Sequence, residues 1–591
     1  MNKKFYVIMF AVLAFAMILS ACGPAAAPEV EEVVEEVVEE VVEETEEVAA
    51  PRDETTVGVK VIDSQTLELT FLKPGLFNAS VAGMWMGYAQ PSWVIEELGD
   101  RWFEPGNIET YGPYTLKDWI HDYEATIIKN PFWVGTEYSP EPKVEEVNFR
   151  FLDPIPALAE YEAGNIDVAA VPSEDMDRVK ADPALSAEYI QMGQFCSYYY
   201  GFNTAAPPMD DVRVRRAFSL AIDRAGLIDN VLKGAQTPAR WVANPGLAGA
   251  PTLETHPDAG IGYDPVAAAA ELQDYLDETG QTAADLDITL LHNESSGHAL
   301  IAETIQAMWK DTLGVEVKIA AQEWKVYLEL TSGPDTPQIF RLGWCLDYPD
   351  ANNFTHELFA LCGNSNACDD GEVYGGIQYF NQEYEDLMDQ AAEETDNAVR
   401  QDLYAEAATL IYNTDAAVAP IYWYGRQTLT KPYVTRTFGM GGHEYFDKWD
   451  TTQDPKTINF TLGYGDIPTL DPSKAEDTSS IQLAILMFPG VTRANEETSV
   501  VEPAMAYSWD VSEDGTVYTF HITEGVPWVK YDEFLDEVVE VTDEEGNVRY
   551  VTADDFYYGF IRTLKKETGS PYAYVLDMVL EGAEDFHYAD E

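Results

Sequence analysis

The run Tyr199-Tyr-Gly-Phe-Asn-Thr204 and the segment Pro207-Pro-Met-Asp-Asp-Val-Arg-Val-Arg-Arg216 that follows it are the most informative part of this chain. Pro and Asp residues that favour a turn stand directly before an amphipathic stretch, which predicts a helix over residues 212–228. A second amphipathic stretch near turn residues predicts a helix over residues 298–313.

Strand-like runs stand between such helices. Residues 66–71, Thr-Leu-Glu-Leu-Thr-Phe, and residues 287–291, Asp-Ile-Thr-Leu-Leu, are two examples. Strands that alternate with helices predict a mixed α/β fold, with open sheets that carry helices on both faces. Sheets of that kind bind ligands in crevices at their edges or between lobes.

Composition limits the partners that this chain can have. Of its 591 residues, 46% are hydrophobic and 12% aromatic, which suits two or three packed lobes better than one compact domain. Asp and Glu total 104 against 35 Lys and Arg, a formal charge of −69. Such a surface repels nucleic acid and anionic lipid headgroups, so DNA or RNA is excluded as a partner. The acidity serves solubility or, alternatively, a preference for cationic ligands.

The N-terminus predicts export. Asn2, Lys3 and Lys4 precede the apolar run of residues 5–19, which is too short to span a bilayer comfortably but suits a signal peptide over residues 1–21. Leu19-Ser-Ala-Cys22 resembles a bacterial lipoprotein box, which implies a lipid on Cys22 as the first mature residue. The alternative is an ordinary signal peptide that ends near a cysteine. We expect contact with the membrane through this lipid anchor only.

An acidic low-complexity linker follows over residues 22–51. Its repeating Val-Val-Glu-Glu run, residues 30–44, combines dense like charge with no aromatic residue, so it cannot bury enough surface to fold alone. We expect a stalk that is extended by self-repulsion.

The four remaining cysteines are an even number in an exported chain, which favours disulfides. Cys362 and Cys368 flank a loop-forming run and close easily into a small hairpin, which leaves Cys196 to pair with Cys345. A zinc site that includes His356 is the alternative, although no Cys-x-x-Cys spacing supports it.

Several stretches together resemble one family, the peptide, oligopeptide and nickel class of ABC-importer binding proteins. Besides the central run of residues 199–224, they are Tyr111-Gly-Pro-Tyr-Thr-Leu-Lys-Asp-Trp119, Met505-Ala-Tyr-Ser-Trp509, Tyr518-Thr-Phe-His521 and Thr552-Ala-Asp-Asp-Phe556. The resemblance covers nearly all of residues 52–591. It implies a two-lobed periplasmic-binding-protein-like fold with an extra subdomain, which closes on its ligand by hinge motion.

The order of these stretches differs from the order in the family. Residues 52–454 resemble the C-terminal portion of the family's binding domain, and residues 455–591 resemble its N-terminal portion. A circular permutation explains this order, because exposed loops of compact domains tolerate a new break. The alternative is a fusion of two truncated gene copies.

One apolar run ends in candidate binding residues. Within Phe340-Arg-Leu-Gly-Trp-Cys-Leu-Asp-Tyr-Pro-Asp350, Asp347 is either presented from the end of a buried strand into a cleft or is part of a turn. The sequence Trp-Cys-x-Asp-Tyr resembles the oligopeptide-binding branch of the family. That resemblance implies that Asp347 pairs with the amine of a peptide, that Trp344 walls the site and that Cys345 is bonded to Cys196.

Three further residues follow from the same resemblance. Gln322-Glu-Trp-Lys325 matches the branch, which places Trp324 beside ligand side chains, and Arg341 and His298 stand where the branch binds the ligand's carboxylate. A core aromatic is the alternative for Trp324, and a surface residue at a helix start is the alternative for His298. Residues 331–337 lack the basic residue that the branch carries there, which leaves the preferred ligand length open.

These features predict a binding protein and no enzyme. No Gly-x-Ser-x-Gly, His-Glu-x-x-His or phosphate-binding glycine motif occurs, and no catalytic residue, metal or cofactor is expected. We expect a monomer at the extracytoplasmic face of the membrane that captures short peptides and delivers them to the membrane subunits of an ABC transporter. An oligosaccharide as ligand, or a sensor that feeds no importer, are the alternatives.

Overall fold

The computed structural model describes residues 53–369, 372–463 and 465–589. The expected signal peptide, Cys22 and the acidic linker lie outside the described residues. Within the described part of the chain, no helix combines the length and the apolar character needed to cross a membrane. Helices and strands alternate along it, so the prediction of a mixed α/β fold is confirmed.

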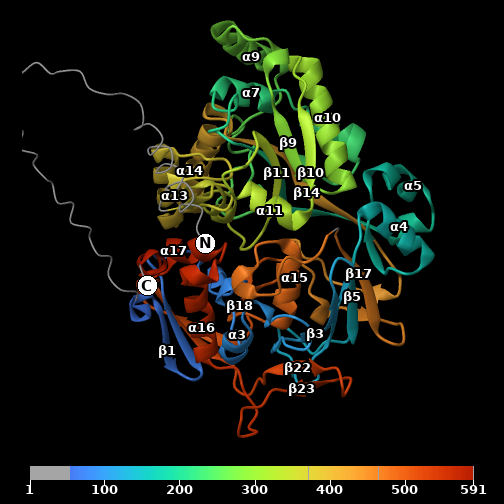
Figure 1. Cartoon of the computed structure of the whole chain (residues 1–591), viewed down its shortest axis with the longest axis vertical. Helices are drawn as coiled ribbons and strands as arrows, with labels where there is room; N and C mark the ends of the chain where they lie inside the picture. The colour runs from blue at the N-terminus through green and yellow to red at the C-terminus, as the bar shows by residue number, and fades with distance from the viewer. Residues whose placement is uncertain (1–52, 370–371, 464, 590–591) are drawn as a thin grey trace, which may run out of the picture. The chain divides into compact units, whose positions relative to one another are not determined.

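A sheet of 11 strands runs through these residues (Figure 1). Its strands in spatial order are β10 (Lys318–Gln322), β9 (Thr289–Asn293), β11 (Ile339–Cys345), β7 (Tyr189–Phe202), β14 (Val418–Thr430), β6 (Val168–Ala170), β17 (Thr457–Gly463), β5 (Glu146–Phe151), β4 (Glu124–Lys129) and β3 (Tyr114–Ile120), and β8 (Thr237–Pro238) pairs with β14 outside this order. Strand β17 is parallel to both β5 and β6. A strand from the last quarter of the chain therefore lies between two strands from its first third.

The centre of this sheet is aromatic and buried. Strand β7 carries Tyr198, Tyr199 and Tyr200, all of them buried, and it pairs along its length with β14. Aromatic residues suit strands that are covered on both faces. On its other edge β7 pairs with β11, in a register that places Cys196 opposite Cys345.

Both predicted disulfides are present. Cys196 is bonded to Cys345, and Cys362 is bonded to Cys368. Because the sulfur atoms of Cys362 and Cys368 are bonded to each other, neither is available as a ligand for the alternative zinc site.

A separate sheet of four strands joins the two ends of the described chain. Its order is β1 (Val59–Asp63), β2 (Thr66–Thr70), β21 (Val517–Ile522) and β20 (Ala506–Val511). Leu67 and Leu69 of β2 are fully buried and lie opposite Phe520 and Tyr518 of β21. Burial at every second position explains why residues 66–70 form a strand.

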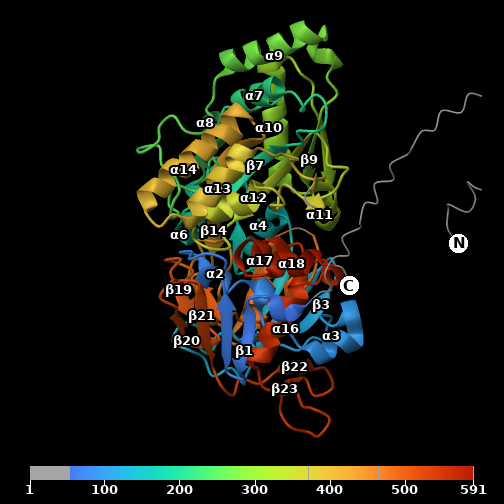
Figure 2. The ribbon, with the colours of Figure 1, turned by 90° about the vertical axis from the view of Figure 1, so that its left-hand side faces the viewer.

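The elements gather in two groups, which we call the upper and lower lobes (Figures 1 and 2). The upper lobe combines β7, β9, β10, β11 and β14 with α7 (Val212–Leu220), α9 (Pro265–Thr279), α10 (Ser296–Leu313), α11 (Trp324–Thr331), α13 (Gln382–Glu393) and α14 (Asn397–Thr409). The lower lobe combines β3, β4, β5, β17 and the four-stranded sheet with α3 (Ser92–Leu98), α15 (Thr478–Met487), α16 (Ala553–Leu564), α17 (Ala573–Val579) and α18 (Ala583–Tyr588). Strand β6 connects them within the large sheet, and α4 (Pro154–Ala163) and α5 (Met176–Ala181) pack beside it. The lower lobe also carries a hairpin of β22 (Val529–Asp532) and β23 (Glu537–Glu540).

Two of the sequence-based helix predictions differ in their outcome. Helix α10 begins two residues before the predicted range of 298–313 and ends as predicted. The helix predicted over residues 212–228 is interrupted, because α7 ends at Leu220 and α8 (Arg224–Leu227) begins anew. The carboxylate of Asp223 accepts a hydrogen bond from the backbone N–H of Gly226, which caps the second helix at its start.

Segments near the two ends of the described chain lie against each other. The backbone N–H of Gly58 donates a 2.6 Å hydrogen bond to the carbonyl of Glu581, and the N–H of Glu581 donates to the carbonyl of Thr70 at 3.0 Å. Residues 452–456 form the short loop that connects β16 (Asp450–Thr451) to β17.

Candidate functional site

Three neighbouring cavities are lined by residues of both lobes. The central cavity has a volume of about 270 Å³, the side cavity about 420 Å³ and the inner cavity about 90 Å³. The central and side cavities share Gln194, Tyr424 and Thr478, and the central and inner cavities share Asp347, His443 and Ile481. The three spaces are thus parts of one cleft.

Five of the six predicted ligand-binding residues line the central cavity. They are Trp324, Arg341, Trp344, Cys345 and Asp347. The sixth, His298, lines the side cavity. Sequence reasoning therefore chose residues that the fold brings together, while the role of each residue stays a prediction.

Asp347 lies just beyond the end of β11, between the central and inner cavities. Its carboxylate accepts a 2.9 Å hydrogen bond from the side-chain amide of Asn353 and a 3.5 Å one from the hydroxyl of Tyr572. Burial raises its pKa to about 7, although both hydrogen bonds act in the opposite direction. Among the described residues it has no cationic partner.

Trp344 fixes one wall of the central cavity. Its indole N–H donates to the side-chain oxygen of Asn353 at 3.1 Å, and its ring lies parallel to the ring of Tyr572 with centroids 6.3 Å apart. The next residue, Cys345, carries the disulfide to Cys196 in β7. The wall therefore combines strands of the upper lobe with an aromatic ring of the lower lobe.

Arg341 is held by its own lobe. Its Nη2 donates to the hydroxyl of Tyr424 at 2.6 Å and its Nη1 to the side chain of Asn293 at 3.1 Å, while the guanidinium lies over the ring of Tyr198. Its Nε has no acceptor among the described residues. The two hydrogen bonds use one N–H each of Nη1 and Nη2, and each of these nitrogens carries a second N–H that a ligand could use.

His298 and Trp324 occupy intermediate positions. His298 is half-buried in the first turn of α10, and burial together with the nearby Arg341 lowers its pKa well below the usual range, so the ring is neutral. Trp324 begins α11, is half-buried and stacks on Tyr327 with centroids 5.9 Å apart. Neither residue is part of a closed core, and both face cavity space.

Comparison with known proteins agrees with this architecture. The family described as bacterial extracellular solute-binding proteins, family 5 Middle, matches residues 25–366 and 500–587, well over half of the chain. The chain belongs to this family. The resemblance to peptide-class binding proteins that the sequence motifs carried is thereby confirmed.

The names of individual relatives of this family 5 protein refer to different ligands. The periplasmic oligopeptide-binding protein OppA of Escherichia coli is 30% identical over 67% of this chain and 69% of its own length. The probable deoxycholate-binding periplasmic protein YgiS of the same species is 31% identical over 66% of this chain and 69% of its own length. A solved oligopeptide-binding protein of an oligopeptide ABC transporter from Borrelia burgdorferi superposes with a TM-score of 0.51 at 25% identity, over 58% of this chain and 65% of that one. The matches therefore span about two thirds of the relatives' lengths.

The family 5 site contains residues that sequence reasoning missed. Glu476, Asp477 and Tyr572 line the central cavity from the lower lobe. Burial raises the pKa of Glu476 to about 7. They stand in the portion after residue 455, far from the Asp347 motif in sequence, so no local pattern linked them to it.

Behind Asp347 lies a second buried carboxyl group. Asn353 donates from the same amide nitrogen to Asp347 and to Glu357, at 2.9 and 2.8 Å, and the hydroxyl of Tyr348 donates to Glu357 at 2.6 Å. Burial raises the pKa of Glu357 to about 8, and the neighbouring Asp347 adds to the rise. The four-residue spacing of Asn353 and Glu357 was the sequence signal that could have indicated this contact, because side chains at that spacing are neighbours on a helix.

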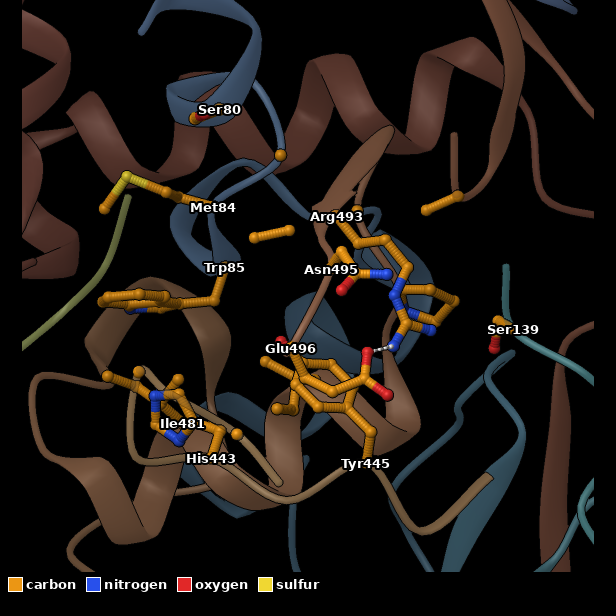
Figure 3. Close-up of a pocket in the computed structure, with 18 of the residues that line it drawn as sticks. Ser80, Met84, Trp85, Ser139, His443, Tyr445, Ile481, Arg493, Asn495 and Glu496 are labelled. Carbon is orange, nitrogen blue, oxygen red and sulfur yellow. Dashed lines mark ion pairs between the residues drawn. The ribbon is translucent and has the colours of Figure 1, made fainter. Parts of the chain in front are cut away.

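The inner cavity ends in a cluster of opposite charges (Figure 3). Arg493 lies over the ring of Tyr445 at 4.4 Å and pairs with Asp447 at 3.2 Å and with Glu496 at 3.7 Å. Lys448 also pairs with Glu496, at 2.7 Å. These two cations and two carboxylates form a connected cluster of ion pairs at this end of the binding protein's cleft.

Proposed function

We propose that this protein captures short peptides in the cleft between its lobes and delivers them to the membrane subunits of an ABC transporter. The observation that carries the proposal is Asp347, a carboxyl group at a cavity wall that is partly shielded from water and has no cationic partner among the described residues. A buried charge without a partner is costly, so the group is poised to accept the ammonium group of a ligand. The names of the OppA relatives support a peptide as the source of that ammonium group.

The predicted site residues have roles consistent with this proposal. Trp344, Cys345 and Trp324 form walls of the central cavity, against which a peptide chain packs. Arg341 and His298 are the proposed groups near the peptide's carboxylate, through hydrogen bonds rather than through charge in the case of the neutral His298. In this scheme the protein itself performs no catalysis, and ATP is used by the ABC transporter that is its partner.

We further propose that the protein is a lipoprotein held at the extracytoplasmic face of the membrane by Cys22, with residues 22–51 as a stalk. The sequence of residues 1–22 supports this part. The monomeric state is likewise a proposal.

The order of the chain is proposed to be a circular permutation, with residues 52–454 and 455–591 as exchanged portions of one binding domain. Three contacts support it. Strand β21 completes the sheet begun by β2, β17 lies between β5 and β6, and Gly58 is hydrogen-bonded to Glu581 at the other end of the described chain. Two truncated copies fused together would not be expected to complete each other's sheets in this way.

The test is to purify the full-length chain, record a native mass spectrum and identify the small molecules released on unfolding. We expect a monomer with a mixture of short peptides, and we expect Asp347→Asn to lose them. Asp335→Asn, which changes an exposed carboxylate near α11, is the matched control and should keep them. Release of sugars or of a bile acid, or an empty protein that ignores added peptides, would refute the peptide proposal and leave the fold intact.

A further inference from the structure

The segment between β2 and α2 (Asn78–Val81) of the lower lobe contacts the upper lobe in a way that the proposed function does not yet use. Figure 2 shows α2 at the upper border of the lower lobe, below α13. In Figure 1 this border lies on the side of α13 and α17, away from α4 and α5, which pack beside the connecting strand β6. We call residues 73–77, Lys-Pro-Gly-Leu-Phe, the clasp segment. Its contacts join the lobes at a place other than β6.

An aromatic stack joins the two lobes at this segment. The ring of Phe77 is stacked on the ring of Tyr348, with centroids 5.2 Å apart and an angle of 23° between the ring planes. Tyr348 belongs to the loop that follows β11 in the upper lobe and is fully buried, and Phe77 is 7% exposed. Separation of the lobes would expose both rings to water, so the stack favours the arrangement in which the lobes are together.

An ion pair between the lobes lies at the other end of the clasp segment. Nζ of Lys73 pairs with Oε1 of Glu393, the last residue of α13. Both side chains are about half exposed, so solvent screens the pair and it contributes less than the buried stack. Because its two charges stand on different lobes, this contact is also lost when the lobes separate.

The lower lobe holds the clasp segment in shape. The side-chain amide of Asn78, which is 2% exposed, donates a 3.0 Å hydrogen bond to the carbonyl of Lys73. The backbone N–H of Leu72 donates to the carbonyl of Val579, at the end of α17, at 2.8 Å. A segment fixed in this way loses little conformational entropy when it contacts the other lobe, so more of the contact energy is available to hold the lobes together.

The stacked tyrosine is the neighbour of the proposed amine anchor. Asp347 lines the central and inner cavities, while the ring of Tyr348 packs on Phe77. The hydroxyl of Tyr348 donates to Glu357 at 2.6 Å. Asn353 in turn donates to both Glu357 and Asp347. A ligand that fixes Asp347 therefore also fixes the ring against which the clasp segment packs.

The contacts of the clasp segment lie outside the cavities. Among the described residues that line the three cavities, none is Lys73, Phe77, Tyr348 or Glu393. Substitution of Lys73, Phe77 or Glu393 therefore leaves the cavity walls in place. An effect of such a substitution on the retention of a ligand must act through the lobes.

We propose that the clasp segment holds the lobes together over a bound ligand, with Phe77 stacked on Tyr348 and Lys73 paired with Glu393, and thereby sets the rate at which the ligand leaves. The part that concerns the ligand rests on the proposed function. The inference adds to that function a set of positioning residues outside the cavities, which act on the release of the ligand and not on its recognition.

The experiment follows the binding and release of trialanine by the full-length chain in stopped-flow tryptophan fluorescence, because Trp324 and Trp344 line the central cavity. Small-angle X-ray scattering gives the radius of gyration with and without the peptide. Phe77→Ala should release the peptide about tenfold faster, because an aromatic stack contributes about that factor, and should associate with it at nearly the wild-type rate. Its radius of gyration should be larger than that of the wild type.

Further variants separate the clasp from a general loss of stability. Phe77→Tyr keeps the stack and should behave as the wild type. Leu76→Ala, at a position of the same segment that is 65% exposed, is the matched control and should leave both rates unchanged. Lys73→Glu and Glu393→Lys should each speed release about two- to fivefold, and the two together should restore slow release, because the ion pair is then present with its charges exchanged.

Each outcome decides the proposal. Release at the wild-type rate in Phe77→Ala overturns the clasp while peptide binding itself stands. If Phe77→Ala does not fold, release at the wild-type rate in both single charge variants overturns it instead. If no alanine peptide of two to six residues binds to the wild type, the proposed function fails and scattering alone decides the clasp. A radius of gyration that the substitutions leave unchanged then overturns the clasp, and a larger one supports it.

Discussion

The side-chain amide of Asn353 donates a 2.9 Å hydrogen bond to the carboxylate of Asp347. The same residue also accepts from the indole of Trp344 and from the backbone N–H of Asp347, both at 3.1 Å, and donates to Glu357. One fully buried amide thus orients the carboxyl group that we propose as the amine anchor, and the aromatic wall beside it.

Replacement of Asn353 by alanine is expected to weaken both stability and ligand binding. The buried indole N–H and the two carboxyl groups would lose their partner, at a cost of about 2–4 kcal/mol in the free energy of unfolding. Thermal unfolding and peptide titration measure the two effects. Asn230→Ala, an exposed position in the upper lobe, is the matched control and should change neither. Unaltered peptide affinity in Asn353→Ala would remove Asn353 from the account of the site.

Peptide affinity should depend on pH through Asp347. The pKa of this group in the empty protein is raised to about 7, and a peptide's ammonium group binds its charged form. Below that pH, binding must first release a proton, so affinity should fall by up to about tenfold per pH unit between pH 7 and pH 5. Calorimetry in two buffers of different ionisation enthalpy counts the proton. Residual binding by Asp347→Asn should be nearly flat over the same range, and a wild type that is equally flat argues against an amine at this position.

The stability of the peptide-free protein should change with pH in the opposite direction from its peptide affinity. Asp347, Glu357 and Glu476 have raised pKa values in the folded state, so the folded protein binds these protons more tightly than the unfolded chain does. Their contribution to stability is fully present below about pH 4 and is lost as the pH rises through about 7 to 8. Glu357→Gln should therefore raise the thermal midpoint relative to the wild type more at pH 8 than at pH 5. An equal shift at both values would show that Glu357 titrates normally.

The two disulfides should contribute unequally. Cys196 and Cys345 are 149 residues apart in the sequence, whereas Cys362 and Cys368 are six apart. Chain entropy gives about 5 kcal/mol for the longer loop and about 2 kcal/mol for the shorter. Denaturant unfolding of the serine pairs Cys196→Ser/Cys345→Ser and Cys362→Ser/Cys368→Ser measures the difference within one protein. A larger loss in the second pair would contradict the loop-length argument.

The permutation is testable by restoring the family's order. A gene that places residues 455–589 before residues 53–454 changes only two connections, because Gly58 already contacts Glu581. We expect the reordered chain to be monomeric, with the circular dichroism spectrum and peptide affinity of the natural chain. A matched control is a chain cut and rejoined inside β7, which should aggregate because it breaks the central pair of the large sheet.

The sequence predicts the fold class and much of the upper half of the site, for physical reasons that differ by residue. Asp347, Trp344 and Cys345 stand in one run, so a local motif suffices to select them. The lower wall does not follow from any local pattern, because Glu476 and Tyr572 reach the cavity only through the pairing of β17 and β21 with strands some 300 to 450 residues earlier.

Local capping also sets limits on sequence-based prediction. The apolar period of residues 212–228 continues across Asp223, but the side chain of Asp223 binds a backbone N–H and starts a new helix. Sequence reasoning also missed the arginines of the side cavity, Arg426 and Arg436, because they lie in an ordinary strand-and-loop segment. Only the burial of Arg436 against Phe438 and Trp449 distinguishes it from a surface arginine.

The pairing of β2 with β21 imposes an order on biogenesis. A chain that emerges N-terminus first, from a ribosome or from a translocation channel, presents residues 66–70 long before their partner at residues 517–522 exists. The position between β5 and β6 likewise stays unfilled until β17 has been synthesised. Contacts of such long sequence separation form slowly. Neither sheet can be completed during synthesis of the first 450 residues, although β7 can already pair with β11 and β14 by then, so the sheets of the lower lobe must be completed after those of the upper lobe.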